Sequence, residues 1–167
     1  PLRTPTLPPA THTNCYVMGQ EDLIVVEPAA RESSTRRLIL DYLDQRIAAG
    51  ARIRAIVLTH HHHDHIGSVV ACRERYGAPV WAHRLTSDRV PFEVDRCLEN
   101  GDVIELDCGQ KWQGLFTPGH APGHICFFDE QTASMIVGDM VAGLGSILVE
   151  PDEGDMGAYL RSLSTMK

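Results

Sequence analysis

A run of histidines constrains this chain more than any other feature of its sequence. Five of the nine histidines fall within six consecutive positions, in the run Thr59-His60-His61-His62-His63-Asp64-His65. The residues before it, Ile53 to Leu58, are mostly apolar and predict a buried strand. A rigid strand would therefore hold the start of the histidine run in a fixed direction.

Alternate side chains of an extended chain lie on the same side. We therefore expect His60 and His62 to project together, and His61 and His63 to face away as loop-surface or supporting residues. The last two residues of the run begin the turn into the next helix and approach the same point from another direction. Imidazole and carboxylate groups are ligands that zinc accepts, and catalytic zinc sites keep one position for water. The run predicts a metal site.

Two further segments carry candidate site residues at the ends of predicted strands. The segment Thr117-Pro118-Gly119-His120-Ala121-Pro122-Gly123-His124 contains two Pro-Gly pairs. Such pairs favour a tight loop with a close backbone approach, which can hold one histidine against a metal. Asp139 follows the apolar strand that ends at Val137. Taken alone, an acid at this position is typical of a turn.

The composition is that of one globular domain over residues 1–167. Of the 167 residues, 43% are hydrophobic and 22% are charged, which excludes disordered, collagen-like and coiled-coil chains. After an extended, irregular lead-in of about a dozen residues, we expect sheets covered by helices, typical of an α/β (α+β) domain. The predicted strands are 14–18, 23–27, 53–58, 79–82, 103–106, 112–117, 125–128 and 134–137. The predicted helices are 33–49, capped by Ser33 or Ser34, 67–76 and 155–166.

Together the three motifs resemble those of the metallo-β-lactamase superfamily, and the resemblance covers most of the chain. It implies a four-layered αββα sandwich, with its second half incomplete in this chain, and a two-metal site at one edge of the sheets. It also implies a role for each matching residue: His60, His62 and His120 on the first metal, Asp64 and His65 on the second, and Asp139 bridging the two.

The resemblance also indicates which other polar residues are not expected to be metal ligands. His124 is expected to support the site or pack in the core, and His12 and His83 have no expected role in metal binding. Glu27 stands in Glu27-Pro28-Ala29-Ala30 where the family often has Asp-Pro-Gly. Its carboxylate is expected to hydrogen-bond a ligand histidine from behind.

One family motif is missing from this chain. The family usually supplies a seventh ligand, a histidine that lies after the helix following the bridging aspartate. Here no histidine follows His124, and the sequence ends at Lys167 inside the predicted last helix. We therefore expect a domain whose C-terminal part is missing.

The site implied by the resemblance predicts a metal-dependent hydrolase. Two zinc ions would supply a bound or bridging hydroxide near neutral pH, and Asp64 would orient that nucleophile as the catalytic residue. The Thr117–His124 loop resembles glyoxalase II thioesterases. The spacing at 138–143 and the acidic run at 150–154 resemble lactamase-like endoribonucleases, which cut single-stranded RNA. The expected bond is therefore a thioester or a phosphodiester, with a lactam least favoured.

Two alternatives come from other functional classes. Sulfur dioxygenases of the same superfamily use a similar ligand set to hold one Fe²⁺ and oxidise a persulfide. The stretch after Asp139 lacks the Arg, Cys and Asp typical of them. A non-catalytic metal-binding domain is the second alternative. Flavo-diiron proteins usually carry Glu at the position of His62, which argues against that branch.

Charge and cysteines limit the partners. Lys and Arg number 15 against 22 Asp and Glu, a net charge of −7, so no strong basic patch for nucleic acid is expected. The expected partner is a small-molecule thioester or single-stranded RNA, with a homodimer left open. The apolar runs are too short to span a membrane. Five scattered cysteines without a C-x-x-C pair, and no recognisable leader, favour the cytoplasm.

Overall fold

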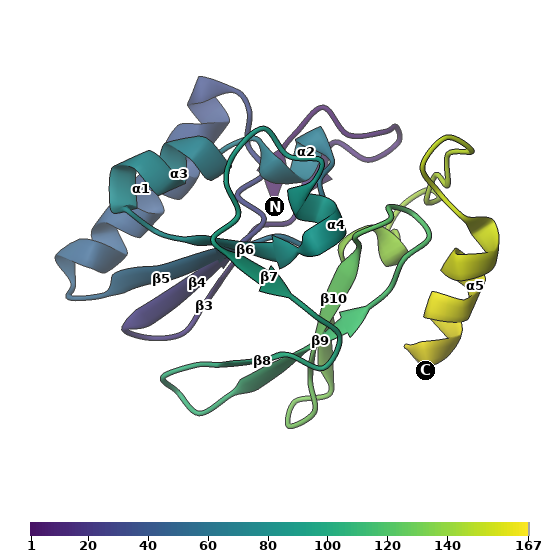
Figure 1. Ribbon diagram of the computed structural model, residues 1–167. Helices are drawn as coiled ribbons and strands as arrows, with labels where there is room; N and C mark the ends of the chain where they lie inside the picture. Colours follow the sequence, from purple (N-terminus) through teal and green to yellow (C-terminus); the bar gives the residue numbers. More distant parts are fainter. Residues whose placement is uncertain (167) are drawn as a thin grey trace.

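The computed structural model describes residues 1–166, which form two facing β-sheets with helices outside them (Figure 1). The strands are β1 Leu2–Arg3, β2 His12–Thr13, β3 Tyr16–Met18, β4 Asp22–Val26, β5 Arg52–Val57, β6 Val80–His83, β7 Arg96–Leu98, β8 Val103–Glu105, β9 Lys111–Phe116, β10 Ile125–Asp129 and β11 Ser134–Ile136. The helices are α1 Ser33–Ala48, α2 His63–Ile66, α3 Val69–Tyr76, α4 Arg84–Ser87, the 3-10 turn η1 Gly138–Met140, and α5 Met156–Thr165.

The first sheet has the strand order β3-β4-β5-β6-β7. Strands β4 to β7 are parallel, and β3 pairs antiparallel with β4. Strand β4 is a continuous apolar run because both faces of this sheet are covered. Val25 packs toward α1 and α3, whereas Ile24 and Val26 pack toward the second sheet. The hairpin predicted over 14–27 is thus confirmed as β3 and β4.

The second sheet is antiparallel throughout, in the order β11-β10-β9-β8. Its inner face contributes Trp112, Phe127 and Ile136 to a buried cluster shared with the first sheet. Burial of large apolar side chains between two sheets stabilises their face-to-face packing. The two sheets are therefore joined by one apolar interior.

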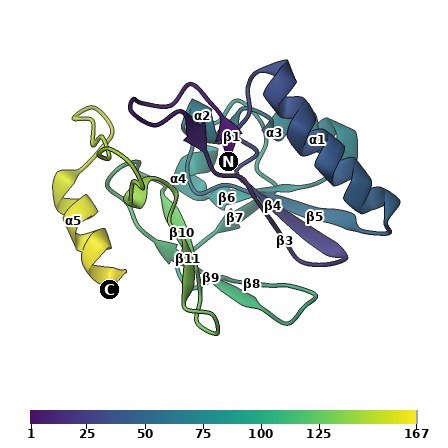
Figure 2. The ribbon, with the colours of Figure 1, turned by 180° about the vertical axis from the view of Figure 1, so that it is seen from behind.

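Helices lie outside both sheets, which confirms the predicted layered fold. Figures 1 and 2 show α1 and α3 over the outer face of the first sheet and α5 beside β10 of the second. Helix α5 is attached to the loop after β9, since the Ser162 hydroxyl donates to the Pro118 carbonyl at 2.7 Å. The Tyr159 hydroxyl donates to the Met140 carbonyl at 2.8 Å. Helix α5 thus packs on two loops that reach the candidate site.

A carboxylate joins the two sheets at the end away from the histidine run. Asp107, in the β8–β9 turn, accepts hydrogen bonds from the backbone N–H groups of Gln20, Glu21 and Asp22 at 2.9, 2.5 and 2.8 Å. Those three residues form the turn between β3 and β4 and the start of β4. The turn of one sheet is therefore held by a side chain of the other.

Several local expectations were wrong. The lead-in contains β1 and β2, which pair antiparallel with Leu2 opposite Thr13. Helix α1 is preceded by Glu32 as its N-cap and has no side-chain cap bond, so neither serine caps it. The predicted helix 67–76 is shortened to α3, behind a separate turn, α2. Strand β7 and helix α4 carry no strong periodicity and were not predicted.

None of the helices in residues 1–166 is both long enough and apolar enough to cross a membrane.

Candidate metal centre

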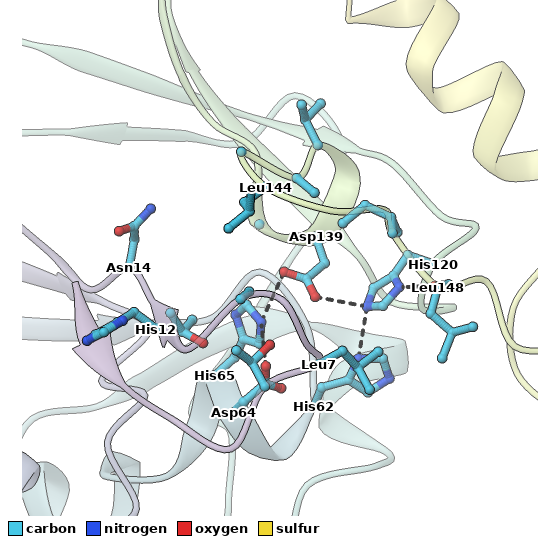
Figure 3. A pocket seen from close by; sticks show the side chains of 18 of the residues that line it. Leu7, His12, Asn14, His62, Asp64, His65, His120, Asp139, Leu144 and Leu148 are labelled. Carbon is cyan, nitrogen blue, oxygen red and sulfur yellow. Dashed lines mark hydrogen bonds and ion pairs between the residues drawn. The ribbon is translucent and has the colours of Figure 1, made fainter.

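The predicted site residues meet at one edge of the two sheets, and Figure 3 shows five of them: His62, Asp64, His65, His120 and Asp139. His60 comes two residues after Leu58, beyond the end of β5, and the short helix α2 carries Asp64 and His65. His120 lies in the loop between β9 and β10, and Asp139 in the turn η1 after β11. Because β5 is parallel to its neighbours and buried, its carboxyl end gives these loops a rigid base.

Three histidines point a nitrogen at one another. His62 Nδ1 lies 2.9 Å from His120 Nε2, and the ring of His60 is centred 4.7 Å from that of His62 and 5.0 Å from that of His120. One donor atom from each of the three lies within 4.8 Å of the others. His60 Nε2 is buried and has no hydrogen-bond partner. The alternation expected for His60 and His62 is therefore present.

The other nitrogen of each of these rings is held by the protein. His120 Nδ1 lies 2.7 Å from the Leu148 carbonyl, and His62 Nε2 lies 2.5 Å from Glu153 Oε1. Carbonyl and carboxylate oxygens only accept, so both of these nitrogens carry the proton in the neutral rings. His60 Nδ1 lies 2.9 Å from Thr59 Oγ1, whose hydroxyl proton goes to Glu27.

In the neutral rings, the nitrogens that face one another therefore carry lone pairs: His60 Nε2, His62 Nδ1 and His120 Nε2. Burial lowers the pKa values of His60 and His120, so both of these rings are neutral near pH 7. When the His62 ring is neutral as well, its Nδ1 lone pair faces that of His120 Nε2 at 2.9 Å, and the two repel unless a cation or a proton lies between them. The buried, unpartnered His60 Nε2 completes a three-nitrogen set that fits a divalent metal ion.

Asp139 lies between two histidines. Its Oδ1 is 3.1 Å from His65 Nε2, and its Oδ2 is 3.5 Å from His120 Nε2. Burial alone would raise its pKa, but the hydrogen bond with His65 and the nearby histidines lower it to about 2. Burial likewise opposes the charge of His65, yet the carboxylates of Glu27 and Asp139 raise the pKa of His65 well above its usual value.

Asp64 is the predicted ligand that fits the cluster least. Its Oδ2 is 3.8 Å from His65 Nε2, and it joins none of the close donor groups among residues 1–166. A different acid, Glu27, forms such a group with His60 and His65. Glu27 Oε1 is 3.0 Å from His65 Nδ1, so the expected contact of Glu27 with a histidine is present.

Gly138 allows Asp139 to approach the histidine run. A Cβ at Gly138 would lie 2.5 Å from His124 Nε2 and 2.6 Å from Thr59 Oγ1, and the residue has φ +49°. Next to it, the Asp139 N–H donates to His124 Nε2 at 3.2 Å. Burial lowers the pKa of His124 to about 3, so this ring accepts as a neutral base. His124 supports the turn, in line with the sequence prediction.

Comparison with known proteins now identifies the family. The profile described as the metallo-beta-lactamase superfamily matches residues 8–167. The chain belongs to this superfamily. The TTHA1623 protein, solved in a di-iron-bound form, has the same fold with a TM-score of 0.72 and 27% identity. The match covers 96% of this chain and 83% of that one.

Two named proteins have similar sequences. An atrochrysone carboxyl ACP thioesterase of Pseudocercospora fijiensis is 30% identical over 155 residues, covering 92% of this chain and 43% of that protein. A hydroxyacylglutathione hydrolase of Synechococcus is 29% identical over 163 residues, covering 94% and 61%. The chain therefore spans between two fifths and about three fifths of these relatives.

Sequence reasoning did not single out Glu153, which contacts the candidate site, and it predicted the wrong direction for the His61 side chain. Glu153 was noted only as part of an acidic run, although its carboxylate contacts the imidazoles of His61 and His62. His61 was expected to face away, but its Nε2 turns to Glu153 Oε2 at 3.0 Å. The available signal was an acid three residues before the last helix, although its partner His62 lies 91 residues away.

Proposed function

We propose that this chain is the metal-binding part of a hydrolase that cleaves thioesters. The observation that carries the proposal is the set of inward lone pairs on His60 Nε2, His62 Nδ1 and His120 Nε2. These three residues would hold one metal ion. Asp64 and His65 would hold a second, with Asp139 shared between the two. Zinc suits a set of imidazoles and carboxylates.

Other residues of the site would position the metal ions, the attacking water and the ligand rings. Metal ions at this site would supply a bound water of lowered pKa and polarise the substrate carbonyl. Asp139 directs one oxygen toward His65 and the other toward His120, which suits a shared carboxylate. Asp64, at the edge of the cluster, would orient the attacking water and accept its proton. Glu153, Leu148 and Thr59 keep the three ligand rings in the required tautomer.

A thioester suits this machinery better than an ester of an alcohol. The leaving group is a thiolate, whose parent thiol has a pKa of about 8.5, so it departs near neutral pH without a proton donor. The names of the two relatives support the same bond, since one is a thioesterase and the other a hydroxyacylglutathione hydrolase. Single-stranded RNA, the alternative suggested by the sequence, has a poorer leaving group.

The test combines metal content with activity. We expect about two zinc ions per chain by elemental analysis of untagged protein, together with hydrolysis of a thioester panel. Replacing both His60 and His62 with Ala should abolish bound metal and hydrolysis, while circular dichroism shows that the helices remain. The matched control is His63→Ala, because His63 lies in the same run but is exposed.

The other outcomes separate the competing functions. Hydrolysis at the wild-type level by the double variant would contradict the proposal. One iron per chain, with oxygen uptake on a persulfide, would support a dioxygenase instead. Cleavage of single-stranded RNA without thioester hydrolysis would favour the nuclease alternative. Metal binding with none of these activities would indicate a non-catalytic domain.

A further inference from the structure

A cavity of about 710 Å³ opens directly onto the proposed metal centre. Its floor includes His62, His65, His120 and Asp139. One wall is the N-terminal arm, residues 5–14, and the other is the loop at 141–148, here called the roof loop. The volume lies within the range of about 300–1,000 Å³ that is usual for small-molecule sites. The cavity is large enough for more than the reacting carbonyl.

Both walls carry apolar side chains that are exposed within residues 1–166. Leu7 of the arm is 58% exposed, and Leu144 and Leu148 of the roof loop are 65% and 42% exposed. Figure 3 shows these three leucines around the group formed by His62, His120 and Asp139. Exposed leucines gathered around a polar centre are typical of a ligand-binding surface. A bound apolar group would remove them from water.

The two walls meet across this space. A Cβ at Gly145 of the roof loop would lie 2.8 Å from Pro9 Cδ of the arm. The roof loop therefore needs glycine here to approach the arm, and Gly145 has φ +83°. This close approach brings the arm and the roof loop together beside the site, while the leucines stay exposed to the cavity. An occupant of the cavity would thus be covered on two sides.

The wall of the cavity carries five carboxylates, and among the described residues that line it there is no lysine or arginine. Within the described residues that line it, the carboxylates are those of Glu27, Asp64, Asp139, Glu150 and Glu153. Asp64 and Asp139 would be compensated by metal, whereas Glu150 and Glu153 lie on the segment that follows the roof loop. Carboxylate side chains close to a ligand repel it when the ligand is itself negatively charged. These glutamates would therefore oppose a thiol carrier that bears carboxylates or phosphates.

We propose that this cavity binds the apolar acyl chain of a thioester whose thiol half carries no negative charge. This inference rests on the proposed function, which supplies the thioester bond, and adds the class of acyl group and of thiol. Leu7, Leu144 and Leu148 contact the acyl chain, and the metal centre at the floor of the cavity binds the thioester carbonyl. Glu150 and Glu153 select against anionic thiols.

Binding can be measured apart from hydrolysis with thioethers, which lack the thioester carbonyl and so cannot be cleaved there. Calorimetric titration would compare S-butyl- and S-octyl-N-acetylcysteamine with S-octylglutathione. We expect affinity to rise about three- to fourfold for each added methylene that is buried. S-octylglutathione should bind about tenfold more weakly than its uncharged counterpart, because its carboxylates approach the glutamates.

A leucine variant and its control test where the bound acyl chain lies. Leu144→Gln should weaken binding of the octyl ether about three- to tenfold, with no change in far-ultraviolet circular dichroism. The matched control is Leu38→Gln, because Leu38 is 64% exposed and lies on α1, away from the cavity. Equal weakening in both variants, or none in Leu144→Gln, would overturn the inference.

A parallel assay with octanoyl-N-acetylcysteamine separates this inference from the proposed function. If the ethers bind as expected but the thioester is not hydrolysed, the proposed function fails and the cavity inference stands. If the thioester is hydrolysed but S-octylglutathione binds as tightly as the uncharged ether, the cavity inference fails and the proposed function stands.

Discussion

Carboxylates occupy both ends of the β-sandwich, but they are used in opposite ways. At the end formed by the β3–β4 and β8–β9 turns, Asp107 accepts three backbone N–H groups from the other sheet. At the histidine end, Asp139 and Glu153 contact imidazoles, and His60 Nε2 remains buried without a partner. At the first end, the hydrogen-bonding groups of the carboxylate are paired with backbone N–H groups of the protein. The other leaves donor atoms for a ligand.

The difference shows how one scaffold can combine stability with a reactive site. Backbone donors of the folded chain satisfy Asp107, so its contribution belongs to folding. The histidine nitrogens face one another with too few protons to share. A cation that binds between them would satisfy them, so their contribution belongs to binding. Substitutions at the two ends should therefore change different measurements.

The largest effect is expected at Glu153, which links the segment before α5 to the histidine run. Glu153→Gln keeps the shape but removes the negative charge that faces His62 Nε2. We expect the affinity for the first metal to fall about tenfold or more, the usual result of removing a residue that orients a ligand. Competition with a chromophoric chelator measures it.

The neighbouring acid provides a control for Glu153. Asp152→Asn makes the same charge change one residue away, at an exposed position. It should leave metal affinity unchanged. Equal losses in both variants would show that net charge, and not the contact with His62, controls affinity, and would weaken the contrast between the two ends.

Asp64→Asn should give a smaller and more selective effect. Asp64 lies 3.8 Å from His65 Nε2 and outside the three-histidine group. We therefore expect turnover of a thioester to fall more than the affinity for the first metal. Measuring kcat together with metal stoichiometry tests this division. Equal loss of both metals would assign Asp64 to holding the site together instead.

Asp107→Asn should lower stability without changing metal affinity. The three backbone N–H groups of Gln20, Glu21 and Asp22 lower the pKa of Asp107 to about 2. A carboxylate whose pKa is lower in the folded state stabilises the fold above its unfolded pKa, about 3.9. That stabilisation is lost as the pH falls from about 4 to about 2.

The expected result is therefore a lower thermal midpoint for Asp107→Asn at neutral pH. The difference from the unmodified protein should shrink as the pH falls below about 4. Asp41→Asn is the control, since Asp41 is an exposed carboxylate on α1. A difference that stays constant with pH would show that the charge of Asp107 does not act through these hydrogen bonds. Reduced metal affinity would contradict the separation of the two ends.

The strongly patterned elements could be predicted from the sequence. Strand β5 and helix α1 carry clear apolar periodicity, and the hairpin β3–β4 is separated by turn residues, so local preference and burial agree. Strand β7 and helix α4 could not be predicted, because they are short and depend on partners far away. The pairing of Leu2 with Thr13 was missed because prolines between them favour an irregular segment.

Local patterns along the chain predicted a metal site at the histidine run, and the family resemblance predicted its ligands. His60 and His62 share a side because backbone alternation is a property of an extended segment itself. Only the tertiary structure decided which nitrogens face inward and what holds the others. Glu153 reaches His62 across 91 positions, and Asp107 reaches Asp22 across 85. Such contacts depend on how distant segments pack, which no local pattern encodes.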